Sequence, residues 1–305
     1  MTPGRVLKWL ALGVAFWLLL SLALLMISAQ LEGGVSPQAE RALAGGSNLF
    51  SGSTILVLGS DARTGESIDE SQTGPARADS IMLVRASFGG VRKLSIPRDS
   101  FAEIPGHGSQ RINAAYAIGG PGLMVETVNA FMGNGLEVNH LVEIDFEDFP
   151  ELVDALGGIT VNSKSRICSP PFDNFFRGLR FKKGKNKLDG TRALGFARVR
   201  KNDCAPGEDD RARAERQQEV FTGIRDELVS PSTFFRLPWA SWRAPKALRT
   251  DMEGPSLLAL FGDVVSAKSD PPAVLQASCP GCGPGGSLLV SEGSKREAVR
   301  QLIEG

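Results

Sequence analysis

The chain has 305 residues, of which 42% are apolar and 22% are charged, a balance typical of a folded globular protein and not of a disordered one. Lys and Arg together number 34, as do Asp and Glu, so the net charge is zero. Global charge therefore gives no argument for binding nucleic acid, and any basic site must be a local cluster.

The chain begins with a long apolar run. Residues 9–29 contain no charge, and a helix of about 20 such residues crosses a hydrocarbon core of about 30 Å. Arg5 and Lys8 precede the run and Glu32 is the first charge after it, which favours a cytoplasmic N-terminus. A cleaved signal peptide is the alternative, but its apolar region is usually about 7–15 residues long. The sequence thus predicts a single-pass protein of the cell membrane, with residues 1–8 cytoplasmic and the remainder outside the cytoplasm.

Glycine, serine and proline in residues 30–50 predict a linker between the membrane and the folded part of the chain. A catalytic domain is expected at residues 51–230. Residues 231–305 are rich in Pro, Ser and Gly, and we expect this C-terminal extension to pack on the same domain.

Three strands are predicted at the start of the folded domain, at residues 54–59, 80–85 and 91–96. The first is a continuous apolar run, as expected for a strand that is covered on both faces. Gly89-Gly90 is a turn signal between the second and the third. We expect the three strands to share one sheet.

Helices and strands then alternate. A helix is predicted at residues 122–131, a strand at 138–144, and a helix from Asp145 to Leu156 that Gly157-Gly158 ends. This alternation predicts an α/β fold in which a central mixed β-sheet is flanked by helices on both faces.

A basic segment, residues 177–187, follows and is interpreted as a solvated loop that attracts anionic lipid headgroups or polymer. Asp189 then caps a helix, and a long helix is predicted at residues 208–229. The tail ends in a strand-like segment, residues 287–290, and a short helix.

Outside the cytoplasm the four cysteines meet oxidising conditions. Cys168 and Cys204 flank the basic segment, and Cys279 and Cys282 have the spacing of a redox motif or of half a zinc site. Because Cys168 and Cys204 are not a close pair of ligands, the pattern favours two structural disulfides, Cys168–Cys204 and Cys279–Cys282, over a metal site.

Charged residues lie at the ends of the predicted strands. The first strand is followed by Asp61 and Arg63, the second is preceded by Arg77 and Asp79, and Arg98 follows the third. Because ligands in open α/β sheets lie outside the carboxyl ends of the strands, Asp61 and Arg98 are well placed to meet one ligand. Taken singly, each residue is better explained as a solvated loop charge or a helix cap.

The long helix carries a more specific pattern, a narrow stripe that is polar in its first half and apolar in its second. Its members are Asp210, Arg213, Gln217, Phe221, Ile224 and Leu228. The apolar half must face the core, so the polar half faces the sheet as well, where unpaired charges are costly. A structural ion-pair network is one explanation. A phosphate site that also uses Arg198 and Arg200 is the other, and the surplus of arginines favours it.

Arginine suits a phosphate site because its planar fork donates two hydrogen bonds to two phosphate oxygens. Aspartates beside such arginines would repel a bare phosphate unless a divalent ion lies between them. Mg²⁺ is commonly held by one or two carboxylates together with phosphate oxygens. Asp61 and Asp79 are therefore the candidate Mg²⁺ ligands.

Six ordered motifs between about residues 52 and 226 together resemble the LytR-CpsA-Psr family. They are Ile55–Arg63, Arg77–Ser80, Leu94–Ser100, Ile112–Tyr116, Arg198–Arg200 and Asp210–Gln217. The resemblance implies an envelope phosphotransferase that takes a glycopolymer from a polyprenyl pyrophosphate carrier and attaches it through a phosphodiester, usually to peptidoglycan. It also implies an apolar tunnel for the lipid tail, an arginine cluster for the pyrophosphate, and Mg²⁺ held by aspartates.

Carried over motif by motif, metal binding falls on Asp61 and Asp79. Substrate binding falls on Arg63, Arg77, Arg98, Arg198, Arg200, Arg213 and Gln217. The cysteine pair around the basic segment and the Cys204-Ala-Pro-Gly segment depart from the family pattern, and they leave the choice between Arg198 and Arg200 open.

The expected reaction is attack by an acceptor hydroxyl on the phosphorus next to the glycan, with polyprenyl phosphate as the leaving group. Arg98, Arg198 and Asp210 are the candidate catalytic residues, and Asp99 is a second candidate base. One rival is a polyprenyl pyrophosphatase, which an acceptor groove would argue against. The other is a non-catalytic, membrane-anchored lipid or glycan-binding protein. With only His107 and His140 present, a histidine-based hydrolytic site has little material, and His140 is expected to have a core role.

Overall fold

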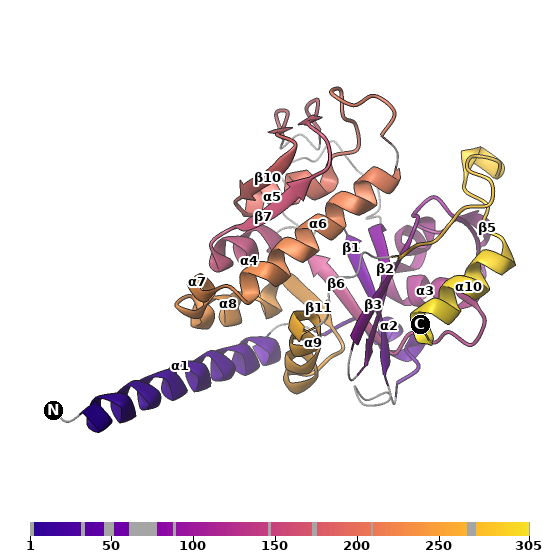
Figure 1. Cartoon of the computed structure of the whole chain (residues 1–305). Helices are drawn as coiled ribbons and strands as arrows, with labels where there is room; N and C mark the ends of the chain where they lie inside the picture. The colour runs from indigo at the N-terminus through magenta and orange to yellow at the C-terminus, as the bar shows by residue number, and fades with distance from the viewer. Residues whose placement is uncertain are drawn as a thin grey trace.

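A computed structural model of the chain shows a central mixed sheet between helical layers (Figure 1). It describes residues 3–31, 34–45, 52–60, 78–87, 90–145, 148–172, 176–208, 210–266 and 273–304. The sheet has six strands in the order β11-β6-β1-β2-β3-β12. The fold class that the alternation of helices and strands predicts is confirmed.

The four central strands include the three predicted at the start of the domain. They are β1 (Ser53–Ser60), β2 (Ala78–Ser87), β3 (Gly90–Ile96) and β6 (His140–Asp145). β1 and β2 are antiparallel, as are β2 and β3, whereas β1 and β6 run parallel. The carboxyl ends of β1, β3 and β6 and the start of β2 therefore lie together at one end of the strands.

Both edge strands come from the chain after residue 230. β11 (Leu248–Thr250) pairs antiparallel with β6, and β12 (Ala273–Val274) pairs parallel with β3. The other elements of this part are α7 (Pro231–Phe234), α8 (Leu237–Arg243), η1 (Pro245–Ala247), α9 (Gly254–Ser266), η2 (Pro284–Gly286) and α10 (Glu292–Ile303).

One face of the sheet packs on α2 (Pro37–Ala42), α3 (Ala114–Met132) and α10. Leu56 and Leu58 of β1 are fully buried in this layer. α2 lies where the sequence suggested only a linker, because Ala39 and its apolar neighbours pack on the same core. α3 begins before the predicted residue 122 and bends at Gly120, whose φ of 65° suits a residue without a β-carbon.

The other face of the sheet carries α9 and α6 (Asp210–Leu228). Ile55 of β1 packs in a cluster with Leu257 of α9, and Val57, two residues on, faces α6. This alternation along β1 explains why its sequence is apolar throughout: each face of the strand is covered.

A second core forms beyond the end of β6. It includes α4 (Phe149–Leu156), α5 (Gly190–Arg198), β7 (Ile159–Ser163) and β10 (Gly184–Leu188), together with the short pair β8 (Ile167–Cys168) and β9 (Arg180–Phe181). The other short pair, β4 (Phe101–Ile104) with β5 (Gly108–Arg111), belongs to the first core, in which Ala102 and Ile104 are buried. The prediction that Asp145 opens α4 is wrong, because Asp145 is the last residue of β6 and α4 begins at Phe149. α4 ends, as predicted, at Gly157, whose φ is 95°. Asp189 caps α5 as predicted, its Oδ1 accepting a hydrogen bond of 2.8 Å from the Arg192 N–H.

The basic segment 177–187 is not the open loop that its charge suggested, because β9 and most of β10 lie within it. In β10, Asn186 and Leu188 are buried while Lys185 and Lys187 point outward. The Asn186 amide donates to the Lys182 carbonyl oxygen at 2.8 Å, which satisfies a polar side chain at an inward position.

Both predicted disulfides are confirmed: Cys168 pairs with Cys204, and Cys279 with Cys282. The first ties β8 to the segment that leads into α6. The pairing uses all four cysteines, so it also excludes the zinc alternative in this state of the protein.

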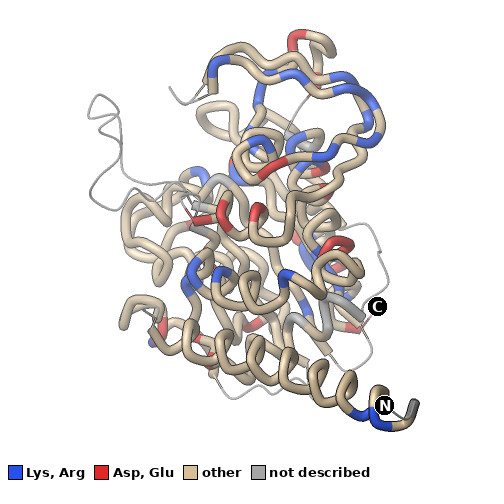
Figure 2. The backbone as a smooth tube through the Cα atoms, turned by 90° about the vertical axis from the view of Figure 1, so that its left-hand side faces the viewer, with Lys and Arg blue, Asp and Glu red and all other residues tan. Residues whose placement is uncertain are grey.

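The first helix, α1 (Pro3–Leu31), contains the predicted span 9–29 and is long and apolar enough to cross a membrane. Figure 2 shows basic residues at its N-terminal end and uncharged residues along the rest. Its first half projects from the domain and its second half lies against α8.

Candidate functional site

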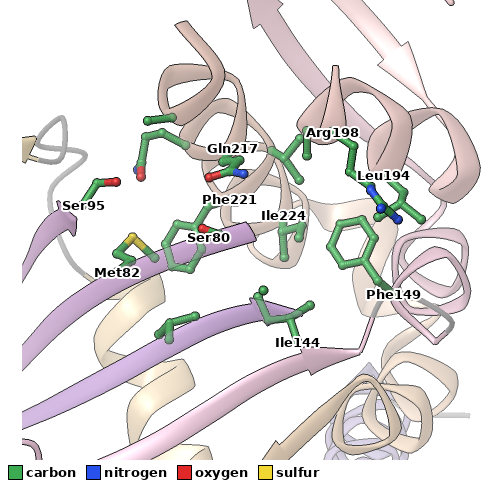
Figure 3. Close-up of a pocket in the computed structure, with 16 residues that line it drawn as sticks. Ser80, Met82, Ser95, Ile144, Phe149, Leu194, Arg198, Gln217, Phe221 and Ile224 are labelled. Atoms are coloured by element: carbon green, nitrogen blue, oxygen red, sulfur yellow. The ribbon is translucent and has the colours of Figure 1, made fainter. Parts of the chain in front are cut away.

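An apolar cavity lies between α6 and the sheet (Figure 3). It encloses about 820 Å³ of empty space, part of which is open to solvent. Its apolar lining includes Val57, Met82, Ile144, Phe149, Leu194, Val220, Phe221 and Ile224. Such a lining suits a hydrocarbon chain better than a sugar or a free phosphate.

The stripe predicted on α6 provides the roof of this cavity. Gln217, Phe221 and Ile224 all point from α6 toward the sheet, at the helical spacing that the sequence indicated (Figure 3). Arg213, one turn earlier, is 4% exposed. The side chain of Asp210, the first residue of α6, lies outside the described part of the structure.

A second, more polar cavity of about 1080 Å³, also partly open, adjoins the first at the carboxyl end of β3. Ser80, Ser95, Ala214 and Gln217 line both cavities. Arg98 and Arg213 line only the second, and its far wall comes from the C-terminal segment, including Gln276, Pro280 and Leu288. The amide of Gln217 therefore marks the boundary between an apolar and a basic space.

The structure brings several of the candidate arginines together around these cavities. Arg98 lies in the turn after β3, and its side chain is 21% exposed. Arg198 ends α5 and lines the apolar cavity, beside Phe149 and Leu194 (Figure 3). Arg200 is exposed in the following loop and lines neither cavity. Of the pair that the sequence left undecided, Arg198 is thus the one at the cavity.

Other candidates fall outside the described residues: Asp61, Arg63 and Arg77, together with the side chain of Asp79. The backbone of Asp79 belongs to β2 and lies at a register shift, because Gly59 pairs with Ser80 and Ser60 with Ala78. An irregularity of this kind re-aims side chains at the rim of a sheet. Among the described residues, no group of three or more His, Cys, Asp or Glu could hold a metal ion.

Asp99 lies between two guanidinium groups. Its Oδ2 is 3.6 Å from Nε of Arg98, and its Oδ1 is 3.4 Å from Nη1 of Arg111. Arg111 also donates a 2.6 Å hydrogen bond from Nη2 to the Gly285 carbonyl oxygen. Asp99 and Arg111 thus link the turn that carries Arg98 to the C-terminal segment.

A second buried arginine on α6 has a structural role that the sequence analysis missed. Arg216 donates from Nη1 to Glu208 at 2.7 Å and from Nη2 to the Val199 carbonyl oxygen at 2.8 Å. Burial would raise the pKa of Glu208, but hydrogen bonds from Ser165, Asn202 and Arg216 outweigh it and hold this pKa below its ordinary value. Glu208 lies in the loop before α6, so no helical spacing in the sequence links the pair.

His140 has the structural role expected of it. It lies at the start of β6, at the edge of the sheet opposite the site, and its Nδ1 is 2.7 Å from Oδ2 of Asp251. The other oxygen of Asp251 accepts the Leu141 N–H at 2.7 Å. This contact ties β6 to the segment after β11.

Comparison with known proteins places this geometry in context. The chain matches the model of the LytR_cpsA_psr family over residues 38–283. The regulatory protein MsrR of Staphylococcus aureus (strain COL) is 34% identical over 189 residues, which are 61% of this chain and 52% of MsrR. The polyisoprenyl-teichoic acid–peptidoglycan teichoic acid transferase TagT of Bacillus subtilis (strain 168) is 33% identical over 223 residues, 71% of this chain and 65% of TagT. The chain thus spans about half to two thirds of the length of these curated relatives.

Solved structures share the fold. TagT bound to LI-WTA has a TM-score of 0.66 and 25% identity, and the match covers 89% of this chain and 97% of that one. The LytR-CPS2A-psr family protein YwtF (TagT) with bound octaprenyl pyrophosphate lipid has a TM-score of 0.63 and 23% identity over the same shares of the two chains.

Proposed function

Because the chain belongs to the LytR-CpsA-Psr family, we propose that it is a phosphotransferase that moves a glycopolymer from a polyprenyl pyrophosphate carrier to peptidoglycan through a phosphodiester. The observation that carries the proposal is the pair of adjoining cavities under α6, one apolar and one lined by arginines. A polyprenyl pyrophosphate likewise has an apolar tail next to an anionic head.

The polyprenyl tail would occupy the apolar cavity and the pyrophosphate would lie where the two cavities meet. The tail would gain from removing hydrocarbon from water, at about 25 cal/mol per Å² of buried apolar surface. Arg98, Arg213 and Gln217 would donate hydrogen bonds to phosphate oxygens, and Arg198 would add positive charge from the end of α5. YwtF (TagT), which has the same fold, is described with octaprenyl pyrophosphate bound.

In the sequence, Asp61 directly follows β1 and Asp79 lies at the start of β2, and the nearby arginines alone give no reason for carboxylates at these two positions. We propose that these two carboxylates hold Mg²⁺ and that it neutralises charge on the pyrophosphate oxygens when bound. Arg63 and Arg77, which are close to them in sequence, would contact the same anion.

In the reaction, the hydroxyl oxygen of the acceptor sugar attacks the phosphorus next to the glycan. The bond from that phosphorus to the bridging oxygen breaks, and polyprenyl phosphate leaves with the electron pair. Arg98 and Arg198 stabilise the charge that develops on the phosphate oxygens. The hydroxyl proton goes to a carboxylate, for which Asp210 and Asp99 are the candidates.

The second cavity favours transfer over hydrolysis. It provides polar space beside Arg98 and Arg213 that a prenyl tail does not need and an acceptor sugar would use. A polyprenyl pyrophosphatase needs room for one water molecule only. Part of the lining comes from the C-terminal segment, so we assign residues 273–290 to the acceptor side of the site.

We further propose that α1 anchors the protein in the cell membrane with its N-terminus in the cytoplasm and its catalytic domain outside. The apolar span and the basic residues Arg5 and Lys8 before it support this orientation. A lipid-linked substrate and the enzyme would then share one membrane surface.

The proposal predicts which lipid accumulates in cells that lack the protein. A polyprenyl-linked glycopolymer should accumulate and the amount of the same polymer on peptidoglycan should fall, with both restored by the parent gene and not by Arg213→Ala. Accumulation of polyprenyl pyrophosphate without any loss of wall polymer would instead indicate a pyrophosphatase.

A further inference from the structure

The exposed part of α1 is too short to cross a bilayer. Residues 4–16 are all exposed, and at about 1.5 Å per residue they extend about 20 Å. The hydrocarbon core of a bilayer is about 30 Å thick. At least about 10 Å of the membrane must therefore surround a part of α1 that other elements already cover, and a tilted helix would increase this length.

The elements that cover it are α7 and α8. Trp17 donates from Nε1 to the Phe234 carbonyl oxygen at 2.8 Å, and Ser28 donates from Oγ to the Trp242 carbonyl oxygen at 2.8 Å. Between these two contacts, Ser21 and Leu25 of α1 are buried. α7 and α8 thus lie beside the second half of α1 (Figure 1).

The outer surface of this region carries several exposed apolar side chains. Among described residues outside α1, the exposed large hydrophobic side chains are Ile118, Val229, Phe235, Trp239, Leu258 and Ile303. Three of the six fall between residues 229 and 239, and Phe235 is 76% exposed. Arg243 lies 4.9 Å from the centroid of the Trp239 ring, and Lys246 lies 5.2 Å from that of Trp242. Tryptophan rings and long basic side chains are both typical of segments at a membrane surface.

Several polar groups in this region hydrogen-bond within the protein, which lowers the cost of a low-dielectric environment. The Thr233 hydroxyl donates to the Glu227 carbonyl oxygen at 2.6 Å, and that of Ser232 to Glu227 Oε1 at 3.0 Å. Arg236 donates to the Leu156 carbonyl oxygen at 3.1 Å.

We propose that α7 and α8 are immersed in the outer leaflet beside α1, with Phe235 and Trp239 among the lipid acyl chains. The inference rests on the proposed function only in taking α1 as the membrane span. The required depth of about 10 Å is within the range for apolar faces of interfacial helices.

Immersion of α7 and α8 would bring the apolar cavity close to the lipid phase. Arg243 of α8 forms an ion pair with Glu151 of α4, and Phe149 of the same α4 lines the cavity. One helix therefore connects the immersed segment to the proposed site of the prenyl tail. We infer that the carrier enters from the leaflet past α4 and α8 without crossing the aqueous phase.

The test measures the depth of single labels in the full-length protein. All four native cysteines are in disulfides, so Phe235→Cys or Trp239→Cys provides one thiol for an environment-sensitive fluorophore. Both side chains are more than half exposed, so replacing either removes little packing. Ile118→Cys, on α3, is the control for an exposed apolar residue far from α1, and Leu12→Cys marks the membrane span. Each protein is reconstituted in vesicles of phosphatidylethanolamine and phosphatidylglycerol.

Labels at residues 235 and 239 should be quenched by nitroxide-labelled lipids and protected from aqueous iodide, while the label at 118 shows the reverse. Quenching by lipid at residue 12 but by iodide at both 235 and 239 would overturn the proposal while leaving the membrane span intact. Iodide quenching at residue 12 as well would overturn the span itself. Transfer activity enters none of these readings, so the proposed reaction can fail without affecting them.

Discussion

Two buried arginines of α6, three residues apart, have different surroundings and therefore different roles. Arg216 is held by Glu208 and the Val199 carbonyl oxygen, whereas Arg213 lines the basic cavity. The sequence indicated that Arg213 faces the sheet, and it offered a structural ion-pair network and a phosphate site as explanations. The structure contains both: a structural pair at Arg216 and a candidate phosphate site at Arg213.

Replacing each of these two arginines by alanine in turn should separate the two roles. Arg213→Ala should weaken binding of polyprenyl pyrophosphate by about 1.5–3 kcal/mol, the contribution of a charge-assisted hydrogen bond, with a small effect on melting temperature. Arg216→Ala should do the opposite and lower stability by about 3–5 kcal/mol, because Glu208 loses its buried partner. Calorimetry and lipid binding on both variants check this. A large loss of stability in Arg213→Ala with affinity retained would make Arg213 structural.

The Arg216–Glu208 pair should also make stability depend on pH. Because the pKa of Glu208 is lower in the folded protein than its ordinary value of 4.5, its contribution is present above that value and is lost as the pH falls through the folded pKa. In Glu208→Gln this part of the acid dependence should be missing. Melting temperatures of parent and variant should therefore converge as the pH falls below 4.5. Parallel curves across that range would contradict the assignment.

The proposed Mg²⁺ ligands can be tested in the same assays. Asp61→Ala and Asp79→Ala should each abolish Mg²⁺-dependent transfer, because either change removes one of the two carboxylates proposed to hold the ion. The melting temperature should change little, since the exchange takes away no apolar core. Glu103→Ala, an exposed carboxylate in β4, serves as the control and should retain activity. Full turnover in both aspartate variants would refute the metal assignment.

At the scale of elements, sequence patterns predicted what depends on local periodicity. The apolar run of β1, the end of α4 at Gly157, the Asp189 cap of α5 and the stripe on α6 are each determined by neighbouring residues. The patterns missed elements that depend on distant partners. β10 was predicted to be a basic loop because its inward-facing Asn186 is polar, and the hydrogen bonds of this side chain to Lys182 and Gly184 make the buried position tolerable.

For the candidate site, too, the sequence predicted what depends on neighbouring residues and missed what depends on distant ones. Motif order placed Arg98, Arg198, Arg213 and Gln217 in one region, since strand ends and a helix stripe determine direction. It could not anticipate that the C-terminal segment lines the second cavity, because β12 pairs with β3 across a long stretch of chain. Nor could it decide between Arg198 and Arg200, which depends on where α5 ends.

The apolar cavity itself supports a prediction about α6. Ile224→Trp should fill part of the space under the helix and weaken binding of long-chain polyprenyl pyrophosphate, while binding of inorganic pyrophosphate remains unchanged. Asp226→Trp, on the exposed side of the same helix, is the control and should affect neither ligand. Equal weakening of both ligands by Ile224→Trp would show that the tail does not occupy this cavity.

At the scale of the whole molecule, the site lies at one end of the sheet, and the C-terminal part of the chain connects it to α1. Arg98 follows β3 at the end of the sheet where β1 and β6 also end, and α6 lies over the adjacent face. The chain after residue 230 closes both sides of the sheet, packs on α1 through α8, and lines the second cavity. A segment whose composition suggested an accessory extension therefore links the anchor, the sheet and the site.

The central claim is that the phosphate next to the glycan moves to the acceptor. We would label that phosphorus in a polyprenyl pyrophosphate-linked glycopolymer and incubate it with the full-length protein, Mg²⁺ and peptidoglycan. The label should become bound to peptidoglycan together with the glycan, in equal amounts, while unlabelled polyprenyl phosphate is released. Omitting peptidoglycan should stop the release. Release of labelled, phosphorylated glycan into water at the same rate without an acceptor would contradict the transferase assignment.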